Sequence, residues 1–189
     1  MSYRRQVSGF FLVAALLTGV VGPLMAQTPQ KTLFGTRDFE MDWQLAPAGK
    51  VLRVRFSAAT KRLRIEALDG SEQVMLRDLV KGDIVILIAQ GQKGAYAQTS
   101  PPLAPFAPQE VGGTREIAGN PCREFSVQGQ KLCVTDDGIP VGVDFGTGSL
   151  TAQSLVRQAQ HPALFLVPKD LVLKPVPGSG ANTLPKLPF

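Results

Sequence analysis

The two cysteines are the residues of this chain whose type and spacing most directly suggest chemistry. Cys122 and Cys133 lie on two short runs in which apolar and polar residues alternate. Alternation places Phe125 and Leu132 on one face of a predicted β-hairpin and both cysteines on its opposite, outer side. A redox pair would need a Cys-x-x-Cys spacing at a helix start, which is missing. We therefore predict a structural disulfide formed in an oxidising compartment.

The register of this hairpin conflicts with a simple bond between opposed cysteines. A tight turn places Cys122 opposite Thr135 and Cys133 opposite Glu124. Such diagonal positions lie about 7–8 Å apart, which is too far for most disulfides. We expect the disulfide to form nonetheless, with an irregularity in the hairpin at Ser126–Gln130.

The other candidate reactive groups lack the partners that their chemistry needs. Asp136-Asp137-Gly138 has none of the further spaced oxygen ligands of a calcium loop and is typical of an acidic turn. His161 is the only histidine, and the chain has no Gly-x-Ser-x-Gly elbow for a hydrolase. No helix follows Gly178-Ser179-Gly180, so this segment is no phosphate loop. We expect neither an enzyme nor a bound metal or cofactor.

The N-terminus has the pattern of a secretory leader. Arg4 and Arg5 precede the apolar run Phe10–Val21, which is shorter than the about 20 residues of a membrane-spanning helix. We predict a signal peptide over residues 1–26 that is cleaved near Ala26. The mature protein is then periplasmic and has no membrane span.

Composition limits what the mature chain can be. Loss of the leader lowers the formal net charge from +5 to about +3, which argues against nucleic acid as a partner. Residues 27–173 are enough for a single antiparallel β domain with its own core. Residues 174–189 are rich in proline and glycine and are predicted to be a disordered tail.

Apolar residues alternate with polar ones along most of the chain after Asp38, which predicts strands. An Asp-Gly turn at Asp69-Gly70 joins two of them. Strands are expected at 38–45, 52–56, 63–67, 74–79, 84–88, 93–98, in the two cysteine runs, and at 138–145 and 149–158. For the last of these, a short helix is the alternative, because periodicity does not decide between the two. Residues 161–165 are expected to form one helical turn. The candidate ligand-binding residues, which share the apolar face of the first three strands, are Phe39, Met41, Trp43, Leu52, Val54, Phe56, Leu63 and Ile65.

No long amphipathic helix is available to cover this apolar face. Four prolines make residues 100–108 a loop, in which Leu103 and Phe106 are apolar. Exposed apolar patches beyond a few hundred Å² are rare on monomers. The sheet must therefore curl on itself, bury the face under the proline loop, or bind a ligand or partner there.

Four arginines alternate with apolar residues on two adjacent strands and form a basic stripe on the polar face. We interpret the stripe as a solvated face with edge protection. Contact with anionic lipid head groups is the alternative. The residues are Arg53, Arg55, Arg62 and Arg64.

Several segments together resemble a family of exported bacterial proteins of unknown function with a LolA/LppX-like architecture. The segments are Thr36-Arg37-Asp38, residues 117–122 (IAGNPC), residues 132–140 (LCVTDDGIP) and residues 162–168 (PALFLVP). The resemblance implies a mostly β protein, a single strongly curved antiparallel sheet that forms an incomplete barrel with few short helices. Better-known proteins of that shape carry lipid or lipoprotein acyl chains, and their cavity-lining helices have no counterpart here.

Two functional hypotheses follow. The first is a non-enzymatic periplasmic protein that holds a lipid-like or apolar ligand, or an acylated partner, on the concave face of its sheet. The second is a structural or assembly factor of the cell envelope with a filled interior and no small ligand.

Overall fold

Alternating residues build nearly all of the described chain into one β-sheet. The structure, a computed structural model, describes residues 33–88, 93–99, 109–127, 129–172 and 174–175. The 3-10 turn η2 is the only helical element of these residues, and no helix among them is long and apolar enough to cross a bilayer. The elements are β1 (Phe39–Ala46), β2 (Lys50–Ser57), β3 (Arg62–Ala67), β4 (Val74–Asp78), β5 (Asp83–Ile88), β6 (Lys93–Thr99), β7 (Gln109–Ile117), β8 (Asn120–Val127), β9 (Gln130–Thr135), β10 (Pro140–Asp144), β11 (Ser149–Val156), η2 (Pro162–Phe165) and β12 (Lys174–Pro175).

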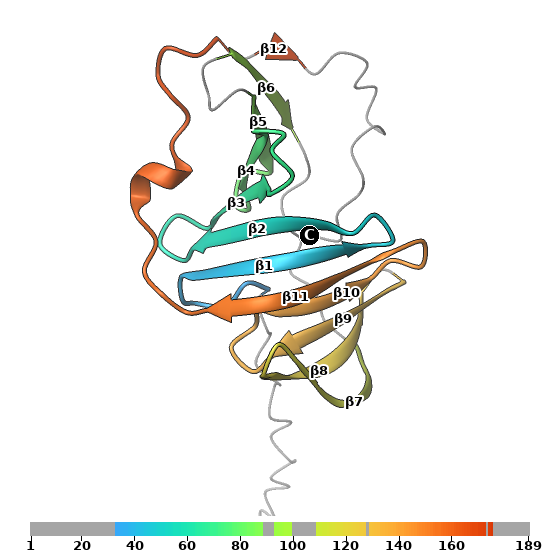
Figure 1. Cartoon of the computed structure of the whole chain (residues 1–189). Coiled ribbons are helices and arrows are strands. Elements are labelled where there is room, and N and C mark those ends of the chain that lie inside the picture. The colour runs from blue at the N-terminus through green and yellow to red at the C-terminus, as the bar shows by residue number, and fades with distance from the viewer. Residues whose placement is uncertain (1–32, 89–92, 100–108, 128, 173, 176–189) are drawn as a thin grey trace, which may run out of the picture.

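The strands form a single open sheet. Their order is β12-β6-β5-β4-β3-β2-β1-β11-β10-β9-β8-β7, and every neighbouring pair is antiparallel except β12 with β6. In Figure 1 the strands from β3 to β6 rise above β2, β1 and β11, whereas β9 to β7 lie below them, so the sheet bends strongly. The predicted fold class, a mostly β protein with one curved antiparallel sheet that does not close into a barrel, is confirmed.

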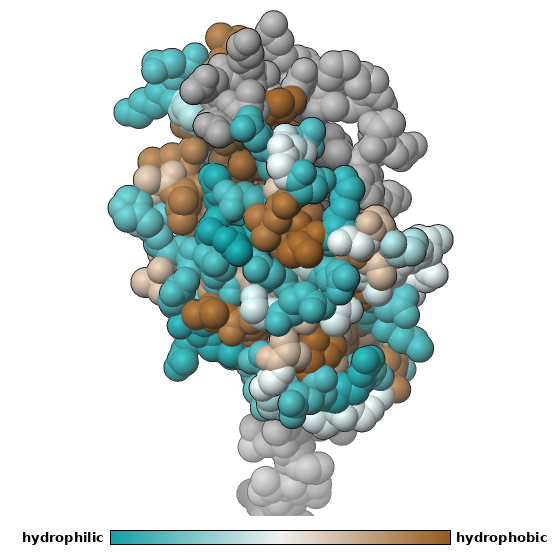
Figure 2. All heavy atoms as spheres, viewed as in Figure 1, coloured by the Kyte–Doolittle hydropathy of each residue, from teal (hydrophilic) through white to brown (hydrophobic). Residues whose placement is uncertain are grey.

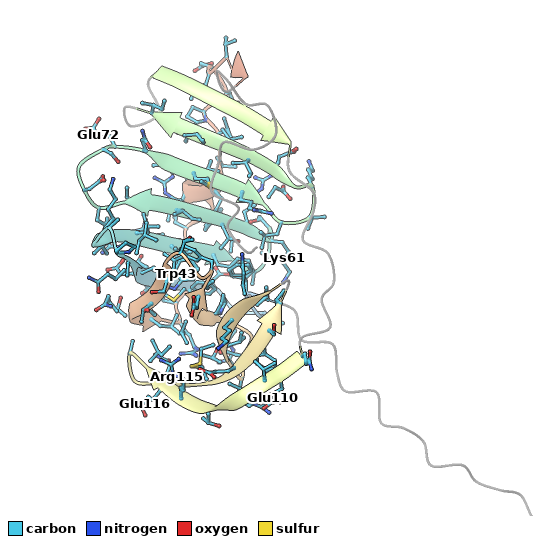
Figure 3. The ribbon with its side chains drawn as sticks, turned by 90° about the vertical axis from the view of Figure 1, so that its right-hand side faces the viewer. Trp43, Lys61, Glu72, Glu110, Arg115 and Glu116 are labelled. Carbon is cyan, nitrogen blue, oxygen red and sulfur yellow. A yellow bond between two sulfur atoms is a disulfide. The ribbon has the colours of Figure 1, made fainter. Side chains whose placement is uncertain are left out.

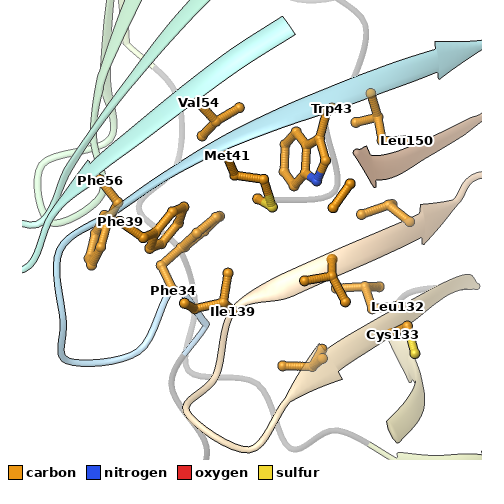
Figure 4. Close-up of a cluster of buried hydrophobic side chains, with 14 of the residues drawn as sticks. Phe34, Phe39, Met41, Trp43, Val54, Phe56, Leu132, Cys133, Ile139 and Leu150 are labelled. Carbon is orange, nitrogen blue, oxygen red and sulfur yellow. The ribbon is translucent and has the colours of Figure 1, made fainter. Parts of the chain in front are cut away.

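The bend brings the second half of the sheet over the apolar face of the first. Figure 4 shows β1 and β2 side chains facing those of β9 to β11, with Phe34 and Ile139 between them. The sequence left three ways to cover this apolar face: curling of the sheet, burial under the proline loop, or binding of a ligand or partner. Among the described residues, the sheet curls on itself and covers the face in the first of these ways. The main core residues are Phe39, Met41, Trp43, Val54, Phe56, Leu63 and Ile65 from β1 to β3, and Phe125, Leu132, Val134, Val141, Val143, Leu150 and Ala152 from β8 to β11.

The residues just before β1 close one end of this core. The Phe34 amide donates a hydrogen bond of 2.8 Å to the carbonyl oxygen of Gly138. Gly35 follows with φ +66°, and a Cβ added to it would collide with the carbonyl oxygen of Asp137. Only glycine fits a left-handed backbone held this close to another chain segment.

The β8–β9 hairpin has the diagonal register that a tight turn imposes. Cys122 pairs with Thr135 and Cys133 with Glu124, without a register shift. The predicted disulfide is confirmed, with a Cα–Cα distance of 5.4 Å. The irregularity predicted at Ser126–Gln130 is wrong, because the right-handed twist of paired strands shortens one of the two diagonals.

The disulfide is buried, although it lies on the side of the hairpin predicted to face outward. Cys122 and Cys133 are 2% and 4% exposed. A Cβ added to Gly142 would lie 2.9 Å from Ile117 Cδ1 and 3.4 Å from Cys133 Cβ, so Ile117 of β7 packs over this side. The edge strand therefore covers the outer side of the hairpin.

Two strands differ from the sequence-based expectations. The pattern does not predict β7, whose residues are mostly exposed and include Gly112 and Gly113. Lys174 and Pro175, expected in a disordered tail, pair with β6 as β12. The predicted leader (residues 1–26), the proline loop and residues 176–189 lie outside the described residues.

Candidate functional site

The strand register shows which side chains share the face that the sheet curls around, here called the concave face. Directly opposed residues of neighbouring strands lie on one face of a sheet. The paired positions of β1 to β5 therefore form three rows across this face. The rows are Phe39, Phe56, Leu63, Arg77 and Ile84; Met41, Val54, Ile65, Met75 and Ile86; and Trp43, Leu52 and Ala67.

All eight predicted ligand-binding residues lie on this face, and the chain itself covers most of them. Trp43 is 1% and Ile65 7% exposed, and Leu52 is partly buried. Apart from Leu52, the part of the face on β1 and β2 is thus core, where a ligand has no free surface to contact. The five residues with no exposed surface at all are Phe39, Met41, Val54, Phe56 and Leu63.

The concave face continues beyond this core onto β4 and β5. Met75 packs against the edge of the main cluster and is partly buried. Ile84 and Ile86 belong to neither of the two apolar clusters of the described residues, and Ile86 is partly exposed. The sequence predicted strands here but assigned no site residue to them.

Arg77 is the one charged residue in these three rows. It lies between Leu63 of β3 and Ile84 of β5. Arg77 is 9% exposed, its Nε has no hydrogen-bond acceptor among the described residues, and burial lowers its pKa. Sequence reasoning missed Arg77 because Val74, Met75 and Leu76 precede it without alternation, so the pattern does not show which face it occupies.

The opposite, outer face of β1 to β3 carries a network of ion pairs. Arg53 Nε lies 2.8 Å from Asp42 Oδ1, and Arg55 Nε lies 2.7 Å from Glu40 Oε2. Glu66 accepts from Arg55 and Arg64. Figure 3 shows the side chains of the strands as sticks, coloured by element, with Trp43 of β1 labelled. The four arginines predicted to form a basic stripe are therefore neutralised, since Arg62 also pairs with an acidic residue, Asp78. This pairing does not favour contact with anionic head groups.

A shallow groove lies on the outer face of β3 to β5. The segment after β11 crosses this face, held by hydrogen bonds from Arg64 to the carbonyl oxygen of Leu164 and from Arg62 to that of Phe165. The groove measures about 530 Å³. Figure 2 shows the hydrophobic side chains of this view in patches separated by hydrophilic ones. The groove walls include Leu68, Val74, Leu87, Leu166 and Pro168.

The predicted reactive groups take structural roles. His161 caps η2, where its Nδ1 accepts a hydrogen bond of 3.2 Å from the amide of Ala163. Asp136 pairs with Arg123, and Asp137 pairs with Arg157. Within the described ranges, no group of three or more His, Cys, Asp or Glu side chains could hold a metal ion.

Asp137 connects β11 with the turn between β9 and β10 and gives a test of acid stability. Arg157 Nε lies 2.6 Å from Asp137 Oδ2, and the Thr135 hydroxyl also donates to this carboxylate. The hydrogen bond from Arg157 is the main reason why the pKa of Asp137 is about 2. In an unfolded chain the pKa is about 3.9.

A lowered folded-state pKa stabilises the protein above the unfolded-state value, and the stabilisation is lost as pH falls from about 4 towards 2. We expect a contribution of about 1 kcal/mol to the free energy of unfolding, reduced by the partial exposure of the pair. Urea unfolding at neutral and acid pH should show a smaller pH dependence in Arg157→Gln than in the wild type. Arg115→Gln, at an exposed pair with Glu124, is the control. Equal pH dependence in Arg157→Gln and the wild type would contradict this prediction.

Comparisons with known proteins show the fold. No family model matches the chain, and no curated protein matches it. An uncharacterised conserved protein from Thermus thermophilus superposes with a TM-score of 0.53 at 13% identity, over 75% of this chain and 91% of that one. PNGF-II superposes with a TM-score of 0.51 at 12% identity over 74% of this chain, which spans about a third (32%) of the PNGF-II chain. MucB gives a TM-score of 0.49 at 17% identity, over 70% and 58% of the two chains.

The superpositions on the Thermus thermophilus protein and on PNGF-II show that other proteins share this β-rich fold. The Thermus protein is itself uncharacterised. Membership of a LolA/LppX-like family stays a prediction from the sequence segments.

Proposed function

We propose that this chain is a non-enzymatic periplasmic protein that binds a lipid-like ligand, or the acyl group of an acylated partner, on the concave face of its sheet. The observation that carries the proposal is the continuation of the apolar rows past the closed core. Ile65, Met75 and Ile86 form one such row across β3, β4 and β5. Apolar side chains at the edge of a packed core provide the surface that an alkyl chain needs.

The binding surface is thus narrower than the eight-residue set predicted from the sequence. Phe39, Phe56 and their neighbours stabilise the fold, whereas Met75 and Ile86 would contact the ligand. This division agrees with burial, since Met75 and Ile86 are partly exposed whereas Phe39 and Phe56 have no exposed surface.

The proposal is tested by native mass spectrometry of protein purified from a bacterial envelope, and by the melting temperature of delipidated protein with added palmitate or hexadecanol. We expect co-purified lipid and a rise in melting temperature.

Ile86→Asn should weaken binding by about tenfold, because it places a polar amide against the alkyl chain. Val80→Asn, at a turn residue that is 65% exposed, is the matched control and should bind as the wild type does. A protein that is always isolated empty and whose melting temperature no lipid changes would contradict the proposal.

The second candidate is a structural or assembly factor that works through its surface. The complete burial of Phe39, Met41 and Phe56 by the chain's own strands favours it. It predicts the opposite result in the same experiment, an empty protein that is indifferent to both lipids.

A further inference from the structure

Arg77 differs from the other arginines in the first half of the sheet in having no counter-charge among the residues that the structure describes. Arg53, Arg55, Arg62 and Arg64 each lie within 3.2 Å of a carboxylate oxygen. None of the ion pairs or hydrogen bonds between described residues involves the Arg77 guanidinium. Arg77 is nevertheless nine-tenths buried, and its Nε has no acceptor within the described part of the chain.

The carboxylates nearest in sequence lie on the other face of the sheet. Asp78 follows Arg77 on β4 and pairs instead with Arg62 of β3, while its side chain also accepts from the Lys81 amide. Asp83 precedes Ile84, the residue paired with Arg77, and so it too lies on the outer face. Directly opposed neighbours of Arg77 on the concave face are the apolar residues Leu63 and Ile84.

A buried guanidinium that no described carboxylate pairs with is unfavourable. Arginine keeps its charge at neutral pH even where burial lowers its pKa. Burying a charge without a partner costs far more than burying an apolar side chain of similar size. A guanidinium also binds carboxylates and phosphates through two parallel hydrogen bonds, so an anionic group is the ligand chemistry that it fits.

We propose that the ligand of the concave face is an anionic single-chain amphiphile whose charged group pairs with Arg77. This inference rests on the proposed function and names the class of ligand. The alkyl chain lies on the neighbouring row, along Ile65, Met75 and Ile86, and the carboxylate or phosphate at its end accepts from the guanidinium. Arg77 thus selects the charged end of the ligand, and the apolar row binds its alkyl chain.

The test compares two probes with the same alkyl chain, palmitate and hexadecanol, in binding assays with delipidated full-length protein. We expect the wild type to bind palmitate about 10- to 100-fold more tightly than hexadecanol, as one charged pair provides. Arg77→Met should lose that preference while binding hexadecanol within about threefold of the wild type, since its side chain remains long and apolar. Arg115→Met, at an exposed arginine with its own carboxylate partner, should behave as the wild type does.

The outcomes separate the two proposals. If the wild type binds neither probe, the proposed function fails, and this inference fails with it. If both probes bind equally well and Arg77→Met changes nothing, only the role of Arg77 is wrong. Inorganic phosphate alone should give no Arg77-dependent rise in melting temperature; an effect as large as that of palmitate would show a free-anion site instead. Ligand-free Arg77→Met should melt no lower than the wild type, because it removes an unpaired charge, and a lower melting temperature would show that Arg77 has a structural partner.

Discussion

Replacing Phe56 with alanine should lower the free energy of unfolding by about 3–5 kcal/mol, as expected for removal of a fully buried aromatic ring. Phe56 has no exposed surface. Its ring centroid lies 5.4 Å from that of Phe39 and 5.8 Å from that of Phe34, and the Lys61 ammonium lies 5.7 Å above it. Equilibrium unfolding in denaturant measures the effect.

This result would separate the core from the binding surface on the concave face. Leu52 faces the same side but is only partly buried, so Leu52→Ala is the control and should cost about 1–2 kcal/mol. The opposite pattern, a Phe56→Ala variant as stable as the wild type that no longer binds lipid, would place Phe56 in a ligand site and contradict the assignment made from burial.

Loss of the disulfide should have the second large effect. Cys122 and Cys133 are 11 residues apart in sequence, and opening a loop of this size lowers the free energy of unfolding by about 3 kcal/mol in the chain-entropy model. Both sulfurs are buried in the cluster that also contains Ile117, which makes replacement by alanine preferable to serine. The variant to make is Cys122→Ala/Cys133→Ala, measured by equilibrium unfolding under oxidising conditions.

The control is the response to reductant. Wild type unfolded with reductant should approach the stability of Cys122→Ala/Cys133→Ala, whereas the double variant itself should not respond. An unfolding midpoint of the wild type that reductant leaves unchanged would mean that the bond contributes nothing to stability.

The two effects concern the scaffold, and the proposed binding surface depends on it. The β1–β2 part of the concave face and the β8–β11 half of the sheet stabilise one another, which holds β3 to β5 at the edge of a packed core. Met75, Ile86 and Arg77 are then presented on strands whose outer face is covered as well. Val167 and Leu171 pack against Leu76 and Leu87 there.

Local pattern predicted most of the strands. The alternation of Phe39, Met41 and Trp43 with Asp38, Glu40 and Asp42 gives β1 its two faces, and the other runs predicted to be strands match β2 to β6 and β8 to β11. The local pattern did not predict β7, because an exposed edge strand needs no alternation of apolar and polar residues. The identity of the bonded cysteines also followed from the sequence, since the chain has only two.

The candidate site could be predicted only in part. The sequence showed that Phe56 and Ile65 share an apolar face, but not that one is sealed in the core while the other lies near its edge. Burial of that kind depends on how far the sheet bends and on which strands come to lie opposite. Both are contacts between segments distant in sequence, and they leave no local pattern.

Arg77 shows the same limit most clearly. From the sequence alone we expect an exported β protein with one apolar sheet face and a single disulfide. These features can be predicted because the alternation of side chains and the number of cysteines are local properties of the sequence. Only the tertiary structure decided that β4 pairs in the register that sets Arg77 opposite Leu63. A shift of one residue would turn this charge to the outer face, because successive side chains of a strand point to opposite sides.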